Sequence, residues 1–206
     1  MAERVPPGRA GRLWLARRLA GAVNSAELLR RKRRLLRKER QDLEAACERT
    51  RARWVERCRD AEAWGLRSAV LGTGRDAAVA AEGLPGRASV EVRWVNSMGV
   101  VHARLASVDP VTVDPARAAA GNAALAPAAR AYGEALEAAA DHAVNQDALR
   151  RIEAELAATQ RRLRGIERHR IPELEAHLAA LELRLEELER EERVAARWVL
   201  RQRGPA

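Results

Sequence analysis

The stretch that decides the fold is LARRLAGAVNSAELLRRKRRLLRKERQDL, residues 15–43, in which leucines and alanines recur every seven positions. The members of this row are Leu15, Ala22, Leu29, Leu36 and Leu43. Seven residues make about two turns of an α-helix, so the row lies along one side of the helix. A partner helix has to cover such a row. The sequence therefore predicts one half of a coiled coil instead of a round core.

The C-terminal part of the chain carries a matching row, in which apolar residues alternate steps of three and four. Its members are Leu163, Ile166, Ile171, Leu174, Leu178, Leu181, Leu185 and Leu188. The step from Ile166 to Ile171 is five residues long, so the row slips by one position beside Pro172. Proline lacks the N–H that a helix interior needs, and we expect it to kink the helix there. A row at each end of the chain predicts two long antiparallel helices that bring the termini together.

A short middle segment has a different period. Val90, Val92 and Trp94 occupy alternate positions, a turn cluster follows at 96–99, and alternation resumes as far as Leu105. Two alternating runs separated by a turn predict a β-hairpin at about 88–106 with one apolar face. An isolated hairpin is marginally stable in water, so we expect it to pack on a helix or a partner.

The expected fold class is therefore mainly α. A long antiparallel two-helix coiled coil is formed by the N- and C-terminal helices, and the small middle segment contains the hairpin. The expected divisions are an N-terminal long helix in 1–70, the middle segment in 71–116 and a C-terminal long helix in 117–206. We expect the last helix to begin near Arg117 or Asn122. Residues 75–86 are expected to be a loop with some helical tendency.

The charge of the chain is concentrated near its N-terminus. The net charge of the 206 residues is +9, and residues 1–57 hold 17 Arg and Lys against 7 Asp and Glu. The centre of this excess, Arg30 to Lys38, has two interpretations. It is either a site for the phosphate backbone of nucleic acid or a basic helix face that meets an acidic protein surface. Leucines interrupt the run at helical spacing and no aromatic stacking residue lies in it, which favours a protein partner.

No constellation of side chains predicts catalysis. The segment Gly72-Thr73-Gly74-Arg75 comes nearest to a phosphate-binding loop, but it lacks the lysine and the spacing, so a helix-ending turn explains it better. The four histidines are scattered, and Cys47 and Cys58 are expected to be reduced thiols. We therefore expect no catalytic, cofactor-binding or metal site. No apolar run approaches the ~18 residues of a membrane span, and a cytoplasmic location is expected.

Several motifs, in order along the chain, resemble one known family. They are Pro7-Gly8-Arg9, the run Leu28 to Leu36 with Glu39, Val90 to Trp94 with Ala103 to Leu105, Asn145, Thr159 to Leu163, Ile166-Glu167, Ile171-Pro172 and Glu189-Arg190-Glu191. Each motif alone is weakly specific, but their order across nearly the whole chain is not. The sequence resembles the D subunit of V-type and A-type ATPases and ATP synthases, which is the central-stalk rotor of these complexes.

The resemblance implies a function in which this chain catalyses no reaction itself. The protein would be the rotor shaft that couples ATP synthesis or hydrolysis in a hexamer of A and B subunits to ion translocation. Its partners would be the A, B, F and C subunits, with no nucleic acid and no cofactor, and it would reach the membrane only through partner subunits. The residues expected to contact partners are Arg30, Arg31, Lys32, Arg33, Val92 and Trp94.

An alternative from another class is a free-standing coiled-coil scaffold or regulator, including one associated with nucleic acid. Periodicity alone does not separate a scaffold from a shaft. In either case the expected coiled-coil core is the same set of leucines. These are Leu15, Leu29, Leu36, Leu43, Leu163, Leu174, Leu178, Leu181 and Leu185.

Overall fold

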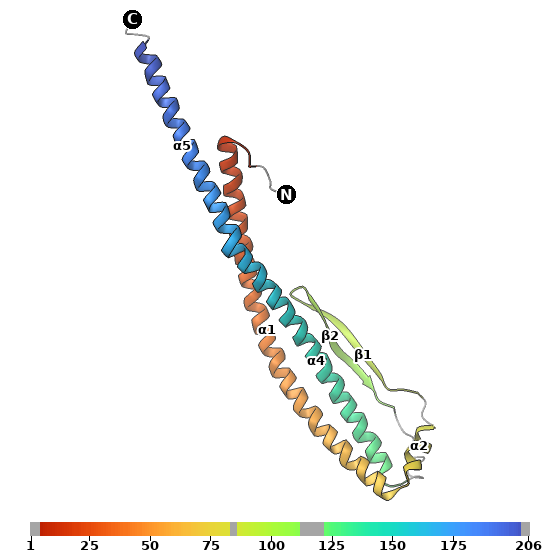
Figure 1. Ribbon diagram of the computed structural model, residues 1–206. Coiled ribbons are helices and arrows are strands. Elements are labelled where there is room, and N and C mark those ends of the chain that lie inside the picture. Colours follow the sequence, from red (N-terminus) through yellow and green to blue (C-terminus); the bar gives the residue numbers. More distant parts are fainter. Residues whose placement is uncertain (1–4, 83–85, 112–121, 203–206) are drawn as a thin grey trace. The chain divides into compact units, whose positions relative to one another are not determined.

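The computed structural model of the protein describes residues 5–82, 86–111 and 122–202. Its elements are α1 (Gly8–Leu71), α2 (Gly74–Glu82), β1 (Ser89–Ser97), β2 (Val100–Asp109), α4 (Leu125–Gly165), the π-helical turn η1 (Ile166–Arg170) and α5 (Ile171–Gln202) (Figure 1). The chain is thus mainly α, with long N- and C-terminal helices and a β-hairpin between them, which confirms the predicted fold class.

The chain divides into two compact units. Unit 1 consists of Met1–Arg34 and Ala157–Ala206, and unit 2 of Leu35–Leu156. The long helix α1 contributes its first part to unit 1 and its second part to unit 2, which also contains the hairpin.

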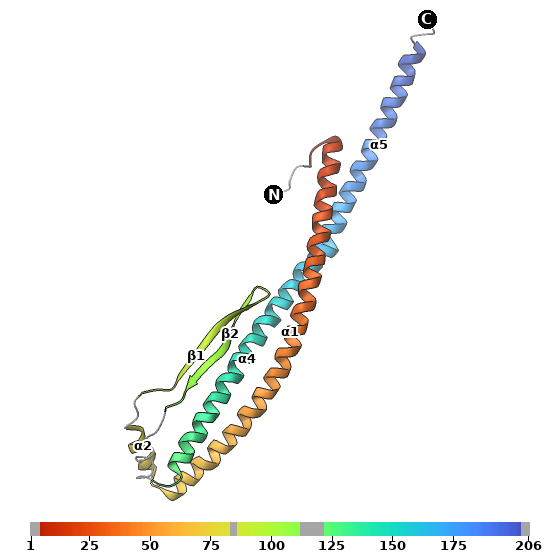
Figure 2. The same cartoon turned by 180° about the vertical axis from the view of Figure 1, so that it is seen from behind.

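In unit 1, α1 runs antiparallel to the C-terminal helices. Arg9 pairs with Glu189 at 3.0 Å, whereas Arg30, further along α1, pairs with Glu167 at 2.6 Å. The residue numbers of the glutamates fall as those of the arginines rise, so the two segments run in opposite directions. Both ribbon views show the two segments side by side (Figure 2). The interface between them is apolar. Its fully buried members are Leu15, Ala26, Leu163 and Leu174, and its half-buried members include Leu29, Leu178, Leu181 and Leu185.

The C-terminal row ends earlier than its period suggests. Leu188, the last predicted member, is 53% exposed, and the Arg9–Glu189 ion pair lies almost at the start of α1. Beyond this level α5 continues to Gln202 without a described neighbour, and Val194 and Trp198 are exposed on it. Figure 1 shows α5 projecting past the first turn of α1.

The slip in the C-terminal row coincides with η1. The N–H of Ile171 bonds to the carbonyl of Ile166, five residues earlier, where an α-helix would use the residue four earlier. We predicted a kink caused by Pro172. The structure accommodates the extra residue in a π turn, and Pro172 follows that turn as the second residue of α5, in a helix that is continuous from α4 through η1.

In unit 2, the second part of α1 runs antiparallel to α4. Arg57 pairs with Glu134 at 2.7 Å, and Thr50 lies 3.2 Å from Nδ1 of His142. Small residues line this interface, with Ala61, Ala131 and Ala135 buried against one another. Side chains of this size allow two helix backbones to come close.

The hairpin belongs to unit 2 and packs on α4 through β2. Its two strands pair antiparallel, with Trp94 opposite Ala103 and a register shift between Glu91 and Val92. Both ribbon views place β2 between β1 and α4 (Figure 2). Near the turn, Val100 enters an apolar cluster with Leu36, Ile152 and Leu156. This contact supplies the helix support that an isolated hairpin would lack.

Two expected boundaries differ from the structure. Residues 74–82, expected to be part of a loop, form helix α2, because Thr73 and Asp76 cap its first turn. The described part of α4 begins at Leu125, later than the predicted start near Arg117 or Asn122, and residue 117 lies outside the described residues. Within 5–82, 86–111 and 122–202, no helix combines the length and apolar character needed to cross a membrane.

Candidate functional site

The segment 72–75, which comes nearest to a phosphate-binding loop in the sequence, forms a junction between three helices in unit 2. The carboxylate of Asp76 accepts hydrogen bonds from the N–H of Thr73 at 2.9 Å and from its hydroxyl at 2.8 Å. The Asn122 amide, just before α4, donates to the Ser68 carbonyl at 3.3 Å and to Asp76 at 3.5 Å. Its oxygen also accepts from the N–H of Ala124 at 3.0 Å. The polar groups of this segment are therefore used in capping helices.

Two properties of this junction follow from its crowding. A Cβ at Gly72 would collide with the side chains of Asp76 and Asn122 and lie 3.2 Å from the Ser68 carbonyl, so a larger residue there would displace both side chains from the junction. Hydrogen bonds from the side chain and backbone of Thr73 lower the pKa of Asp76 below its usual value of 3.8. Desolvation opposes this shift, and the contact with Asn122 adds to it.

The histidines of unit 2 have structural partners. Nδ1 of His102 donates to the Ala103 carbonyl at 3.2 Å, since a carbonyl can only accept. The ring of His142 stacks on Trp54 with centroids 5.6 Å apart. The Thr50 hydroxyl donates to the Cys47 carbonyl at 3.2 Å, so its contact with His142 has Nδ1 as the donor. Among the described residues no group of three or more His, Cys, Asp or Glu is placed to hold a metal ion.

The basic run of α1 in unit 1 is the first candidate surface. Nε of Arg30 donates to Glu167 at 2.8 Å, so the charge of Arg30 is compensated inside the chain. Arg31 is exposed, whereas Lys32 and Arg33 are half-buried and Nε of Arg33 is buried without a hydrogen-bond partner in the described chain. Within unit 1 the exposed residues of the basic run are therefore Arg31 and Arg34, while Arg37 and Lys38 are exposed in unit 2.

A shallow groove of about 510 Å³ runs along this face. It is lined by Asn24, Glu27, Leu28, Arg30, Arg31 and Arg34. The side chain of Leu28 is 68% exposed in it, so the groove offers apolar surface between positive charges. Such a surface can receive an acidic helix end or loop of another protein.

The hairpin is the second candidate surface. Val92 is 40% and Trp94 57% exposed, so both side chains are accessible to a partner. The guanidinium of Arg151 on α4 lies 5.5 Å from the Trp94 ring centroid and donates to the Val101 carbonyl at 3.3 Å. Asp147 holds Arg151 at 2.6 Å. Trp94 is therefore held in place from behind by a cation–π contact while much of its ring remains open.

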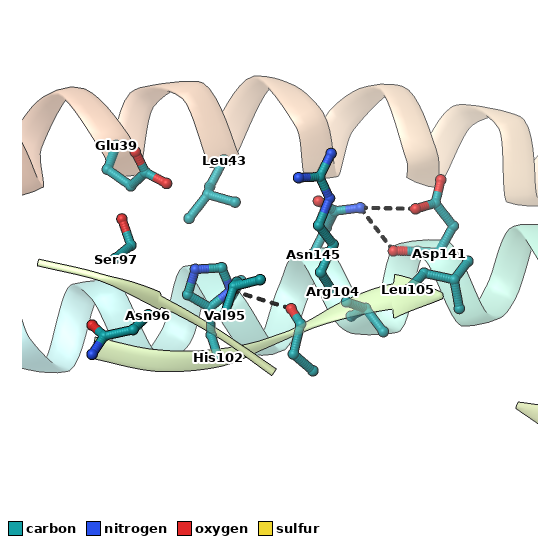
Figure 3. Close-up of a pocket in the computed structure, with 13 residues that line it drawn as sticks. Glu39, Leu43, Val95, Asn96, Ser97, His102, Arg104, Leu105, Asp141 and Asn145 are labelled. Atoms are coloured by element: carbon teal, nitrogen blue, oxygen red, sulfur yellow. Dashed lines mark hydrogen bonds between the residues drawn. The ribbon is translucent and has the colours of Figure 1, made fainter. Parts of the chain in front are cut away.

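A groove of about 530 Å³ separates the hairpin from the two helices of unit 2 (Figure 3). Glu39 and Leu43 come from α1, Asp141 and Asn145 from α4, and His102 from β2. The amide of Asn145 donates to the carbonyl of Asp141 at 2.8 Å and to its carboxylate at 3.1 Å, as the dashed lines show. Apolar and charged groups alternate along the walls, with no convergent set that would bind one particular ligand.

Sequence reasoning missed the junction around Asn122. A signal was present, since Thr73 and Asp76 have the spacing of a capping box with Asp in place of Glu. Ser68 and Asn122 are 54 residues apart in the sequence, so no local sequence pattern predicts their contact.

Comparison with known protein families identifies the chain. The family model that describes the ATP synthase D subunit matches residues 13–201 of the chain. No protein in a search of curated sequences matches.

Proposed function

The chain belongs to the family of ATP synthase D subunits, and from this membership we propose that it is the central rotor shaft of a V/A-type rotary ATPase or ATP synthase. The shaft couples ATP synthesis or hydrolysis in a hexamer of A and B subunits to ion translocation. The chain itself is not catalytic. ATP is made or split on the partner chains, and this chain needs no cofactor.

The observation that supports this proposal best is the pairing of distant segments in both units. In unit 1 the first part of α1, and in unit 2 its second part, lies antiparallel to a later segment of the chain, as the ion pairs Arg30–Glu167 and Arg57–Glu134 mark. Two helices joined in this way resist twisting better than one helix, which suits an element that transmits torque.

The mechanism rests on differential contact energy. A shaft whose faces differ presents a different surface to each A/B pair of the hexamer, so each pair is biased toward a different state. Rotation exchanges these surfaces among the pairs, and the free energy of contact couples rotation to catalysis. The shaft has an uneven surface of this kind, with Arg31 and Arg34 on one face of unit 1 and exposed apolar residues elsewhere.

The outward basic face of α1 meets acidic or helix-end surfaces of the hexamer. Contacts between exposed charges are weak individually and screened by salt, which suits a surface that must be released at each step of rotation. The double variant Arg31→Glu with Arg34→Glu should weaken binding to the A/B hexamer, most strongly at low ionic strength. Equal binding of variant and wild type at low salt would refute this contact.

The hairpin contacts partner subunits on the side of F and C, and the chain reaches the membrane only through them. Deleting Ser89–Asp109 should change the ATPase rate or its coupling to ion transport while leaving the helical circular-dichroism signal of α1 and α4. Trp94→Ala, which removes the exposed ring and keeps the strands, should show part of the same effect. Loss of all helical folding on the deletion would contradict a role limited to partner contact.

Copurification distinguishes this proposal from the coiled-coil scaffold. The full chain, tagged and expressed in its own cells, should bring down the A, B and F subunits in stoichiometric amounts. Salt-sensitive binding to DNA with no ATPase subunits would instead support the nucleic-acid-associated alternative. A cytoplasmic location, peripheral to the membrane, follows from the same complex.

A further inference from the structure

The turn η1 is the only π-helical segment in the part of the chain that the structure describes. Its five residues, Ile166–Arg170, lie in unit 1, and none of them is buried. A π turn has poorer hydrogen-bond geometry than an α turn, and single π turns within α-helices occur frequently at functional sites. Packing against a core does not explain this one, because it contributes no buried side chain.

The π turn keeps the apolar row on one side of the helix. In a regular α-helix a step of five residues would turn Ile171 about 140° away from Ile166. One π-helical turn contains roughly one residue more than one α-helical turn, so Ile171 returns to the side of the helix that Ile166 occupies. The burial of Leu163 at 1% and of Leu174 at 4% shows that the row is continuous on both sides of η1.

The extra residue is not needed for that continuity. If one residue of η1 were removed, the step from Ile166 to Ile171 would become four, and the row would follow regular α-helical spacing. The helix would run uninterrupted through this region of unit 1 only if Pro172 were also replaced, because the proline ring clashes with a carbonyl of a regular helix. The chain therefore carries a locally less favourable turn that the apolar packing of unit 1 does not require.

Contacts on both sides fix the position of the π turn. Glu167, within the turn, receives two hydrogen-bonding groups of Arg30 from α1, Nε at 2.8 Å and Nη2 at 2.6 Å. On the other side, Pro172 cannot donate the α-helical hydrogen bond to the carbonyl of Arg168, and its ring would clash with that carbonyl in a regular helix. The extra residue is thus confined to the segment between these two residues.

We propose that η1 is a torsionally compliant turn, a place where unit 1 changes its twist without opening the interface between α1 and the C-terminal helices. A change of twist here alters the wide, exposed turn and leaves Leu163 and Leu174 buried. The part of this inference that concerns torque rests on the proposed rotor function. The local compliance of the turn does not depend on it.

The first test uses the isolated full-length chain and hydrogen exchange. Amides within 167–171 should exchange at least about tenfold faster than those of 156–163. Deletion of His169, an exposed residue of the turn, combined with Pro172→Ala, should slow exchange in this segment to the level of its flanks and should leave the melting temperature equal or higher. Equal exchange in the turn and its flanks, or no change on deletion, would overturn the proposal.

Two further variants serve as controls. Deletion of Ala180, in the regular part of α5, removes one residue without a π turn to absorb it and should lower the melting temperature, because Leu181 and Leu185 rotate away from α1. Pro172→Ala should spread fast exchange beyond Ile171 into the first turn of α5. If exchange in that variant stays confined to 167–171, Pro172 does not fix the turn.

The second test uses the rotary complex, reconstituted with its partner subunits. The angular fluctuation of a bead on the shaft, measured while the hexamer is stalled, should be narrower with the His169 deletion combined with Pro172→Ala than with the wild-type chain. An unchanged width would refute the mechanical role. Failure of the chain to assemble with A and B subunits would refute the rotor function alone, because the hydrogen-exchange result would still stand.

Discussion

Gly72 shows how one residue decides the path of the chain at the end of α1. Its missing side chain leaves room for Asp76 and Asn122 to meet the last turn of α1. Three helix ends use the same few hydrogen bonds, so a single added methyl group disturbs all of them. This is the position in unit 2 where a conservative change should have the largest effect.

Gly72→Ala should lower the free energy of unfolding by about 1–3 kcal/mol, because the new methyl group overpacks the junction. Gly21→Ala is the matched control. Its Cβ meets nothing within 4 Å in the interior of α1, and alanine there should stabilise the helix by about 0.5–1 kcal/mol. Thermal unfolding followed by circular dichroism measures both. A stabilising effect of Gly72→Ala would contradict the crowding at the junction.

The pKa of Asp76 gives a pH-dependent prediction. Since the folded state lowers this pKa, the Asp76 carboxylate contributes stability above its usual value of 3.8, and the contribution is lost as the pH falls through the lowered pKa. Asp76→Asn should therefore be less stable than the wild type at pH 6, and the two melting temperatures should converge below pH 3.8. If the difference between the two melting temperatures stays constant over this pH range, the stabilising effect of the Thr73 hydrogen bonds does not depend on the negative charge of Asp76.

At the scale of the elements, helix pairing depends on a few buried leucines. Leu36 is fully buried against Val100, Ile152 and Leu156, whereas Leu28, eight residues earlier on the same helix, is 68% exposed. Leu36→Ala should cost about 2–5 kcal/mol of unfolding free energy. Leu28→Ala should stay within about 0.5 kcal/mol. Denaturant titration of the two variants checks the pair, and similar losses would contradict the assigned helix face.

The periodicity of the sequence was sufficient to predict the long helices, because rows of leucine at steps of three and four have one structural solution. The five-residue step at Ile166 also predicted a slip at the correct place. Pro172 alone did not predict how the helix accommodates the extra residue. A kink and a π turn are both common where a proline removes a helical hydrogen bond. Helix α2 was missed because its Ala-rich pattern is weak and its capping box has Asp in place of Glu.

The candidate surfaces were predictable as types of surface, but the state of each side chain was not. The basic run of α1 was evident from composition, whereas the partner of Arg30 is Glu167, more than a hundred residues away in the sequence. A long-range ion pair of this kind depends on the antiparallel register. That register is a property of the folded pair of helices and not of either helix alone.

At the scale of the whole molecule, the end of α5 should separate stability from assembly. The side chains described between Glu191 and Gln202 are exposed, including Val194 and Trp198. Deleting 191–206 should therefore change the unfolding free energy by less than about 0.5 kcal/mol. Binding to the A/B hexamer should weaken, because exposed apolar residues on an isolated helix are available to a partner. Calorimetry and copurification measure the two effects, and a large loss of stability would mean that this segment packs on the chain itself.

The alanine-lined interface of unit 2 has a consequence for how motion passes between its helices. Ala61, Ala131 and Ala135 have no rotamers, so this contact loses no side-chain entropy on folding and holds no alternative packing arrangement. A leucine interface can absorb a small displacement by changing χ angles, whereas these alanines have no χ angle to change. A shift of α1 at Ala61 therefore displaces the facing part of α4 and is not taken up by side-chain rearrangement at this contact.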